Sequence, residues 1–538
     1  MVAFKNLKYF NQQDKHTNTS LIMAAIAIVF TAKALYLSFC VTPLWSIPDE
    51  IGHLAYVYDI AEERGIPLLG ESKIDSDIMS SYKGTDGARP SNNWIAQHPP
   101  LYYILASIPL KIGRQITKDK ETLFKLPRIV SAISGGLALF VIFSTIQLIG
   151  LDAYRSILIA SAIGFIPMFT HLCSGVNHDS SLLFFSATAV YFLTKFIMNK
   201  NIHDAYWSGL WMTLTAAIKM TSWVIIPPFL AIIGFQILFS QKKWIKHTIK
   251  VSVLTLAIPI LWMGRNFYYF ADPLYTASTK AHWRLSEPLK DSFLTYLTSQ
   301  PVVQHLLLNF YALIGWQTPG ITGNTWFQIR GFPLKYFLLV LFFMVVALAI
   351  ALFKTIKQLH TNNYNFKQAD TQFMPLRNFL SNKKTRCLII NTSIAISTFF
   401  CVLLFSNSHF SIIPFSDLRI LSICLLVWAC CLSLVIMVWT TTMGPRQILM
   451  SFGLITFLFF TFTLLQPLYK AYLMDGRMRA THGRYFYPVT PFIILSFAIA
   501  VYNLRINRTF LFFGVIGLAI MEWYSYLLLI IPFFWSFK

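Results

Sequence analysis

Residues 129–149 read IVSAISGGLALFVIFSTIQLI, a run of 21 residues without a charged side chain. A helix needs about 20 mostly apolar residues to cross a bilayer, and a spanning helix satisfies its own backbone hydrogen bonds in lipid. Similar runs recur along the whole chain, so we predict an all-α polytopic membrane protein with about 13 transmembrane helices. The expected spans lie near residues 21–42, 129–149, 154–172, 181–198, 205–219, 222–240, 251–267, 335–353, 387–406, 418–439, 447–466, 488–503 and 510–535.

The overall composition supports this class. Of 538 residues, 56% are hydrophobic and 12% are charged, and the mean hydropathy is +0.57. An average soluble domain has about 25% charged residues, so soluble, disordered and disulfide-scaffold proteins are excluded, the last because only 7 Cys are scattered along the chain. The net charge of +22 follows the membrane topology described next, and we expect no nucleic-acid partner.

The lysines and arginines in short connections predict the orientation. Lys5, Lys8 and Lys15 precede the first span, which predicts that the N-terminal segment 1–20 is cytoplasmic. With 13 spans, the basic clusters in 242–250 and 354–386 fall on the same side. This agreement requires that the apolar run 99–116 does not cross, so we predict a re-entrant or interfacial segment there.

After the N-terminal segment 1–20, this topology divides the chain into three further parts. The first is a transmembrane module, 21–270, that includes a large first extracytoplasmic loop, 43–128. A second extracytoplasmic loop, 271–334, follows it. The remaining helices, 335–538, include a smaller outer loop at 467–487.

The first outer loop opens with Ser-Ile-Pro-Asp-Glu-Ile-Gly-His at 46–53, which is typical of a helix start because Ser46 and Asp49 have capping-box spacing. Asp49 and His53 then share one helix face. Paired acids in a first turn are ordinary helix-dipole partners, and a lone buried histidine is usually a packing residue. A carboxylate at the water–lipid boundary is also where a general base can be tuned, so Asp49 and Glu50 are candidate catalytic residues.

Several further ionisable residues lie at predicted outer helix ends. Asp179 lies in a short outer loop, and Lys219, Arg265 and Arg484 lie where spans emerge, against the usual charge bias. Each cation alone could snorkel to lipid headgroups. The first outer loop is acidic, with nine acids and four Lys or Arg between residues 43 and 100. Several cations on the same side of the membrane as this loop favour binding of a phosphate-bearing lipid.

At this point the motifs resemble those of the GT-C superfamily, integral-membrane glycosyltransferases that use polyprenyl-phosphate-linked sugars. Pro48-Asp49-Glu50 with His53 resembles the acidic motif of their first outer loop, and His98-Pro-Pro-Leu resembles an element of the protein O-mannosyltransferase branch. Further elements look like those of bacterial proteins assigned to the superfamily, including the lipid A aminoarabinose transferase type: Asn177-His178-Asp179, Lys219, Trp262-x-x-Arg265-Asn266 and Gly483-Arg484-Tyr485-x-x-Pro488.

The resemblance implies transfer of a sugar from a polyprenyl phosphate to a glycan, lipid or protein acceptor at the extracytoplasmic face. Asp49 would be the general base, and Glu50 would orient the acceptor or help bind a cation. Substrate and phosphate would be bound by His53, His98, Asp179, Lys219, Arg265 and Arg484. A divalent metal stays open, with Glu50, His53 and Asp179 as candidate ligands; no cofactor is certain. The expected location is a bacterial inner membrane, although the endoplasmic reticulum obeys the same physics.

Two other functions remain open at this stage. A transporter or flippase of lipid-linked glycans is disfavoured because the predicted spans look free of charge near their midpoints, where transporters place ionisable residues. An O-antigen polymerase or ligase would share the polytopic architecture and the arginine-rich outer loops. Neither the donor sugar, the acceptor nor the oligomeric state follows from the sequence.

Overall fold

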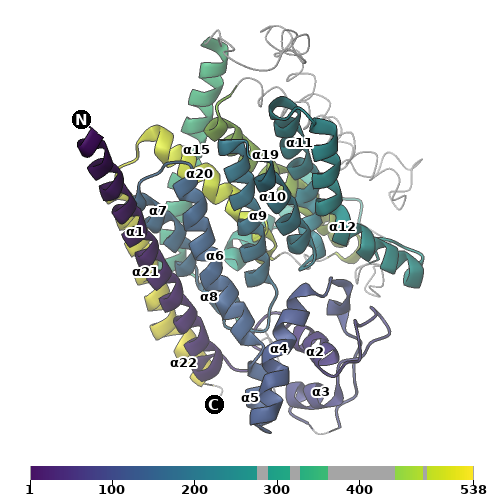
Figure 1. Ribbon diagram of the computed structural model, residues 1–538. Helices are drawn as coiled ribbons and strands as arrows, with labels where there is room; N and C mark the ends of the chain where they lie inside the picture. Colours follow the sequence, from purple (N-terminus) through teal and green to yellow (C-terminus); the bar gives the residue numbers. More distant parts are fainter. Residues whose placement is uncertain are drawn as a thin grey trace.

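The computed structural model describes residues 2–85, 87–275, 289–315, 327–361, 443–476 and 482–536. Most of these residues form helices packed into a bundle (Figure 1). Its long members are α1 (Val2–Tyr36), α6 (Arg128–Leu148), α9 (Asp179–Asn199), α10 (Ile202–Ala216), α11 (Ile226–Ser240), α12 (Trp244–Phe270), α15 (Phe332–Thr361), α19 (Pro445–Asp475), α20 (Thr490–Leu504) and α21 (Arg508–Ser525).

The described residues contain eight helices that are long and apolar enough to span a membrane, or nine if one bent pair counts as a span. Two of the 13 predicted spans, 387–406 and 418–439, lie outside the described residues, as does most of the basic segment 354–386. Two others are helices of only 15 residues, α10 and α20. The chain is therefore a multi-pass membrane protein, and the count of 13 stays a prediction.

The bent pair replaces the straight span predicted at 154–172. It consists of α7 (Ala153–Ala162), the 3₁₀ turn η3 (Ile163–Phe165) and α8 (Pro167–Cys173), bent by 71°. Pro167 causes the break, because proline lacks the amide hydrogen that continues a helix and forces the residue before it to be extended. Ile166 is accordingly extended, with φ −89° and ψ 114°.

The first outer loop folds into a small helical unit at one end of the bundle (Figure 1). It contains α2 (Glu50–Ala61), α3 (Ser76–Lys83), the 3₁₀ turn η2 (Trp94–Gln97), α4 (Leu101–Ile116) and α5 (Lys120–Lys125), around a core that includes Trp45, Leu54 and Tyr56. Helix α4 covers most of the run 99–116, packs on α2 and is not among the candidate spans. It exposes four isoleucines at every fourth position, namely Ile104, Ile108, Ile112 and Ile116.

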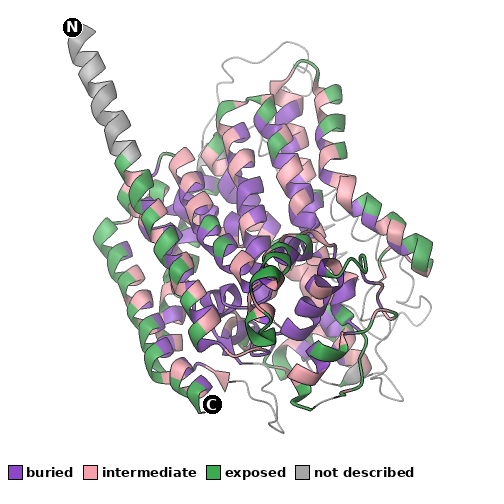
Figure 2. Cartoon of the chain, turned by 60° about the horizontal axis from the view of Figure 1, so that its bottom comes forward, coloured by how far each residue is buried: buried purple, intermediate pink, exposed green. Residues whose placement is uncertain are grey.

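Close backbone contacts hold the bundle together. A Cβ on Gly136 of α6 would lie 2.7 Å from the Ala27 carbonyl oxygen, so only glycine lets α1 and α6 approach this closely. In Figure 2 buried residues line the interior and exposed ones the outer faces.

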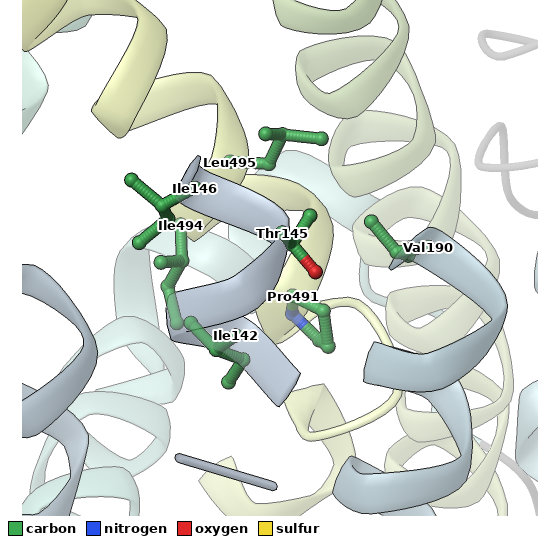
Figure 3. Close-up of a pocket in the computed structure, with 7 residues that line it drawn as sticks. All are labelled: Ile142, Thr145, Ile146, Val190, Pro491, Ile494 and Leu495. Carbon is green, nitrogen blue, oxygen red and sulfur yellow. The ribbon is translucent and has the colours of Figure 1, made fainter. Parts of the chain in front are cut away.

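Figure 3 shows an apolar pocket between α6, α9 and α20, lined by aliphatic residues and Thr145, whose hydroxyl donates to Val141 of its own helix. This pocket contains no ionisable group.

The expectation that the spans are free of charge near their midpoints is wrong. Lys33 lies inside the candidate span Asn18–Val41 and Glu522 inside Arg508–Trp535. The Lys33 ammonium lies 2.7 and 2.9 Å from the two carboxylate oxygens of Glu522. One residue per long apolar run does not interrupt the hydropathy pattern, which is why the sequence reading overlooked both.

The last outer segment returns to the first loop. The described chain after α12 includes α13 (Phe293–Ser299), α14 (Val302–Tyr311) and a two-residue β-pair, β1 (Leu313–Ile314) with β2 (Phe327–Gln328). The 3₁₀ turn η7 (Gly483–Phe486) packs directly on α14, where a Cβ on Gly483 would meet the Leu306 carbonyl at 2.2 Å. This glycine lets the next residue, Arg484, reach the first loop. After α20 and α21, the described chain continues into η8 (Tyr526–Ile530) and α22 (Ile531–Trp535).

Candidate active site

The N-terminus of α2 differs from the predicted capping box. The helix begins at Glu50, and Asp49 is its N-cap in the left-handed region, with φ 61° and no hydrogen bond from its side chain to its own helix. A left-handed non-glycine residue is strained, and such strain persists only where the surroundings impose it. Here the surroundings turn the carboxylate away from the helix and toward two partners from distant parts of the chain.

Those partners are an arginine and a tryptophan. Arg484 Nη2 donates to Asp49 Oδ2 at 2.5 Å, and Trp94 Nε1 donates to Oδ1 at 3.2 Å. The side chain of Asp49 is 22% exposed and that of Arg484 only 4%. Burial raises the pKa of Asp49, but the charge and hydrogen bond of Arg484 act against it, and that pKa is lowered to about 2. The carboxylate is therefore ionised at neutral pH and still reachable from outside.

A second carboxylate lies on the other side of Arg484. Asp179, the first residue of α9, is completely buried and accepts a hydrogen bond from Lys219 Nζ at 2.7 Å. Arg484 Nη1 lies 3.8 Å from its other oxygen. Two acids and two cations thus alternate in one network, Asp49, Arg484, Asp179 and Lys219, built from four segments that are far apart in the sequence.

Three histidines and a tyrosine pack together next to this network. The Tyr103 hydroxyl of α4 lies 3.0 Å from His53 Nδ1 and 2.9 Å from His178 Nδ1. The His98 ring packs against the His178 ring, with centroids 4.9 Å apart. The structure thus brings together Asp49, His53, His98, Asp179, Lys219 and Arg484, six of the eight residues singled out in the sequence.

These histidines are neutral. Burial lowers the pKa of His53 to about 3, and it lowers the pKa values of His98 and His178 well below their usual range. The nearby Lys219 ammonium acts in the same direction on His98 and His178. A neutral imidazole between phenolic and amide groups can orient its neighbours through hydrogen bonds. The charged groups of the site are then the four residues of the network, Asp49, Arg484, Asp179 and Lys219.

Glu50 has surroundings different from those of its neighbour Asp49. Its side chain is fully buried, and its two oxygens accept from Arg128 Nε at 2.9 Å and Arg128 Nη2 at 3.0 Å. Each oxygen also accepts a backbone amide, from Val176 and from Trp45. All four contacts are made within the protein. The buried Glu50 carboxylate is therefore not accessible to an acceptor or a cation.

Arg128 is a residue that the sequence reading missed. It is the first residue of α6, it is fully buried, and all five of its N–H groups donate. Besides Glu50, its acceptors are the carbonyl oxygens of Ser38, Thr42 and Pro43. It therefore joins the ends of α1, α2 and α6 directly behind Asp49. The sequence signal for Arg128 was an arginine directly before an apolar run. This signal is weak, because a charged residue at the boundary of a span is common.

Arg265 lies apart from the Asp49 network. Its guanidinium lies over the Trp262 ring at 4.4 Å and donates to the Pro67 carbonyl at 2.8 Å. Trp262 Nε1 donates to the Gln97 carbonyl at 3.3 Å, next to His98. The Trp-x-x-Arg motif thus fastens the first outer loop to α12, and its arginine engages backbone carbonyls rather than the Asp49 network.

The described residues do not fit a divalent metal at the three candidate ligands. Within those ranges no group of three or more His, Cys, Asp or Glu side chains could hold a metal ion. Glu50 is held by Arg128 and two amides, and Asp179 by Lys219.

The site contains buried polar atoms that await a partner. Arg484 Nε, Asp179 Oδ2 and His98 Nδ1 have no hydrogen bond to the rest of the described chain. Leaving such groups unsatisfied in a protein interior is costly. Three of them around one carboxylate that is partly open to solvent indicate a site that is completed by a polar ligand.

Comparison with protein families locates a match in the first half of the chain. Residues 97–263 match the family described as dolichyl-phosphate-mannose-protein mannosyltransferase. This range contains His98, Asp179 and Lys219, whereas Asp49, Arg265 and Arg484 lie outside it. The match confirms the resemblance to GT-C glycosyltransferases over that range. No curated protein matches the chain.

Among solved structures, the S. cerevisiae protein O-mannosyltransferase Pmt1–Pmt2 complex bound to its sugar donor is 15% identical, with a TM-score of 0.34 over 51% of this chain and 39% of that one. The chain thus spans well under half of that relative. ArnT from Cupriavidus metallidurans bound to undecaprenyl phosphate is 13% identical, with a TM-score of 0.31 over 81% and 79%. The Archaeoglobus fulgidus oligosaccharyltransferase is 13% identical, with a TM-score of 0.33 over 89% and 55%.

Proposed function

We propose that this multi-pass membrane protein, which resembles GT-C glycosyltransferases over residues 97–263, transfers a sugar from a polyprenyl phosphate to an acceptor at the extracytoplasmic face. The acceptor is a glycan, a lipid or a protein. The membrane is the bacterial inner membrane, with the N-terminus in the cytoplasm. The observation that carries the proposal is the partly exposed Asp49 carboxylate paired with the buried Arg484, which also lies beside the buried Asp179–Lys219 pair.

In this reaction Asp49 is the general base. It removes the proton from an acceptor hydroxyl while the hydroxyl oxygen bonds to the anomeric carbon of the donor sugar. The bond from that carbon to the phosphate oxygen breaks in the same step. A single displacement of this kind inverts the anomeric centre. Of the two carboxylates in the network, Asp49 is the more exposed, since Asp179 is fully buried.

The leaving polyprenyl phosphate gains negative charge as the bond breaks, so cations aimed at it are worth most in the transition state. Arg484 presents an unsatisfied Nε, and Lys219 lies within one residue of the membrane-facing helix η4–α11 (Met220–Ser240). These two groups are our phosphate-binding candidates. Arg265 we assign instead to holding the first loop, on the contacts described above.

The ion pair itself suggests how the base becomes active. With its pKa lowered to about 2, Asp49 is ionised but weakly basic. A donor phosphate that binds Arg484 competes with Asp49 for the same guanidinium. When Arg484 turns to the phosphate, the pKa of Asp49 rises toward its usual range, so the base strengthens only when donor is bound.

The remaining candidates orient groups. His98 offers its Nδ1, which has no hydrogen bond to the described chain, to a sugar or acceptor hydroxyl. His53, whose two ring nitrogens contact Tyr103 and Asn177, orients these neighbours, and Asp179 holds Lys219 in place. Glu50, together with Arg128, fixes the backbone on which Asp49 sits; we therefore propose a positioning role for it rather than contact with the acceptor.

The function is tested by mass spectrometry of envelope glycans and lipids from three strains: wild type, a deletion, and the deletion carrying Asp49→Asn. We expect one sugar to disappear from one product in the deletion, and the Asn variant to behave like the deletion at normal protein level. A product that loses a whole glycan chain would instead favour a polymerase or ligase. Identical profiles in all strains would contradict the proposal.

A second candidate function is transport of a lipid-linked glycan, and one observation favours it. The Lys33–Glu522 pair lies within two candidate spans, as ionisable residues of transporters do. Movement of substrate across proteoliposomes by the purified protein, without any covalent product, would support this function over glycosyl transfer.

A further inference from the structure

Lys33 and Glu522 form an ion pair inside two candidate spans, outside the candidate active site. Lys33 lies eight residues before the end of its span Asn18–Val41, and Glu522 lies 13 residues before Trp535. At 1.5 Å per residue these positions are roughly 12 and 20 Å from the outer ends of the spans. Ionisable residues at such depth are costly and are usually kept for a purpose.

The contacts of the pair explain what it holds. Lys33 Nζ donates to the Gly164 carbonyl at 3.1 Å, in the turn between α7 and α8. The Thr170 hydroxyl of α8 donates to Glu522 Oε1 at 2.6 Å. A break in a membrane helix frees backbone groups that lipid cannot satisfy. The two charges therefore secure the bend of 71°, one on each side of Pro167.

Helix α8 leads from this pair to the candidate active site. The residue after Thr170, His171, places its Nε2 3.2 Å from the Ser46 carbonyl, three residues before Asp49. Ser174 lies 3.2 Å from Thr42 through their hydroxyls. The segment that follows α8 supplies the Val176 amide to Glu50 and the Asn177 side chain to His53.

We propose that Lys33, Glu522 and Thr170 form a positioning cluster that sets the place of α8, and through α8 the geometry around Asp49 and Asp179. Helix α8 has only seven residues and sits after a proline break, so its own hydrogen bonds fix its direction weakly. The cluster ties it to both the first spanning helix and the last described one. This inference rests on the proposed function only for its kinetic readout.

The test variant is Thr170→Val, because valine has almost the shape of threonine and leaves the charge pair intact. Thr170→Ser keeps the hydroxyl and serves as the rescue. The matched control is Thr145→Val, a buried threonine whose hydroxyl donates within its own helix. Variants of Lys33 or Glu522 would leave a buried charge unpaired and risk loss of folding, so they are not the primary test.

For Thr170→Val we expect a fall in kcat of about 10-fold with an unchanged KM for the donor, and near wild-type rates for Thr170→Ser and Thr145→Val. A purely structural role would lower the amount of folded protein and its thermal midpoint but leave kcat per folded molecule unchanged; that result would overturn the inference.

A second measurement does not depend on the reaction. Hydrogen–deuterium exchange of the purified protein should show faster exchange in residues 171–179 of Thr170→Val, and unchanged exchange there in Thr145→Val. If wild-type protein transfers no sugar but this change is seen, the proposed function fails and the positioning cluster stands. Unchanged exchange in residues 171–179 overturns the cluster whatever the reaction.

Discussion

Arg484 Nη2 and Asp49 Oδ2 lie 2.5 Å apart although 435 positions separate the two residues in the sequence. The contact joins the last outer segment to the first outer loop and puts a permanently charged donor on the most accessible carboxylate of the network. It has two consequences: Asp49 is ionised at every physiological pH, and any phosphate that reaches Arg484 alters the basicity of Asp49.

Replacing Arg484 tests the second consequence. We expect Arg484→Ala to lower kcat by about 10²- to 10³-fold, the usual cost of losing a donor aimed at developing negative charge. It should also weaken binding of undecaprenyl phosphate in a thermal-shift titration. Arg505→Ala, an exposed arginine at the other end of α20, is the control and should leave both values unchanged.

The pH dependence follows from the lowered pKa values. With Asp49 at about 2, and His53 and His482 at about 3, none of these three groups titrates between pH 5 and 8. We expect none of these three groups to produce a bend in kcat/KM over this window. Burial raises the pKa of Asp59, in the first loop, to about 6. A bend near pH 6 that disappears in Asp59→Asn therefore belongs to the loop, whereas one that persists contradicts the assigned site charges.

Stability should depend on pH even where activity does not. A histidine whose folded pKa is lowered binds protons preferentially when unfolded, so its contribution is complete above pH 6.5 and declines as the pH falls toward about 3. Each such histidine can cost up to about 1.4 kcal/mol per pH unit in that window. We expect the thermal midpoint of the purified protein to fall between pH 7.5 and pH 5, and His53→Asn to reduce the slope.

The pair of Glu50 and Arg128 makes a prediction opposite to a catalytic role. Glu50→Gln leaves a buried guanidinium without its counter-charge, which costs about 3–5 kcal/mol of stability. We expect a large drop in thermal midpoint and in protein level. The double variant Glu50→Gln with Arg128→Met should recover part of the midpoint. Equal midpoints for wild type and Glu50→Gln, with activity lost, would return Glu50 to the reaction itself.

Arg265 can be separated from the phosphate-binding cations in a similar way. We expect Arg265→Ala to make the first outer loop more sensitive to limited proteolysis, because the loop loses its tie at Pro67, while the KM for the donor stays the same. If the KM rises and proteolysis does not change, Arg265 binds phosphate and the interpretation of the Trp262 motif is wrong.

Which features could be predicted from the sequence depended on how far apart along the chain the interacting residues lie. Local patterns sufficed for the apolar helices and for a helix start beside Asp49, since hydropathy and helix-start signals extend over a few residues. The partners Arg128 and Glu50 are 78 positions apart, and Lys33 and Glu522 are 489 apart. No local pattern links such pairs. The left-handed backbone of Asp49 was also out of reach, because the partners of its side chain, Arg484 and Trp94, come from elsewhere in the fold.

The most direct measurement compares donor turnover by purified wild-type protein, Asp49→Asn and Asp77→Asn, with a polyprenyl-phosphate sugar and release of polyprenyl phosphate as the readout. Asp77 is an exposed acid of the same loop, paired with Lys120, and is the matched control. We expect wild type and Asp77→Asn to turn over the donor alike, and Asp49→Asn to be slower by about 10²- to 10⁴-fold per folded molecule. Full activity of a folded Asp49→Asn protein would contradict the account.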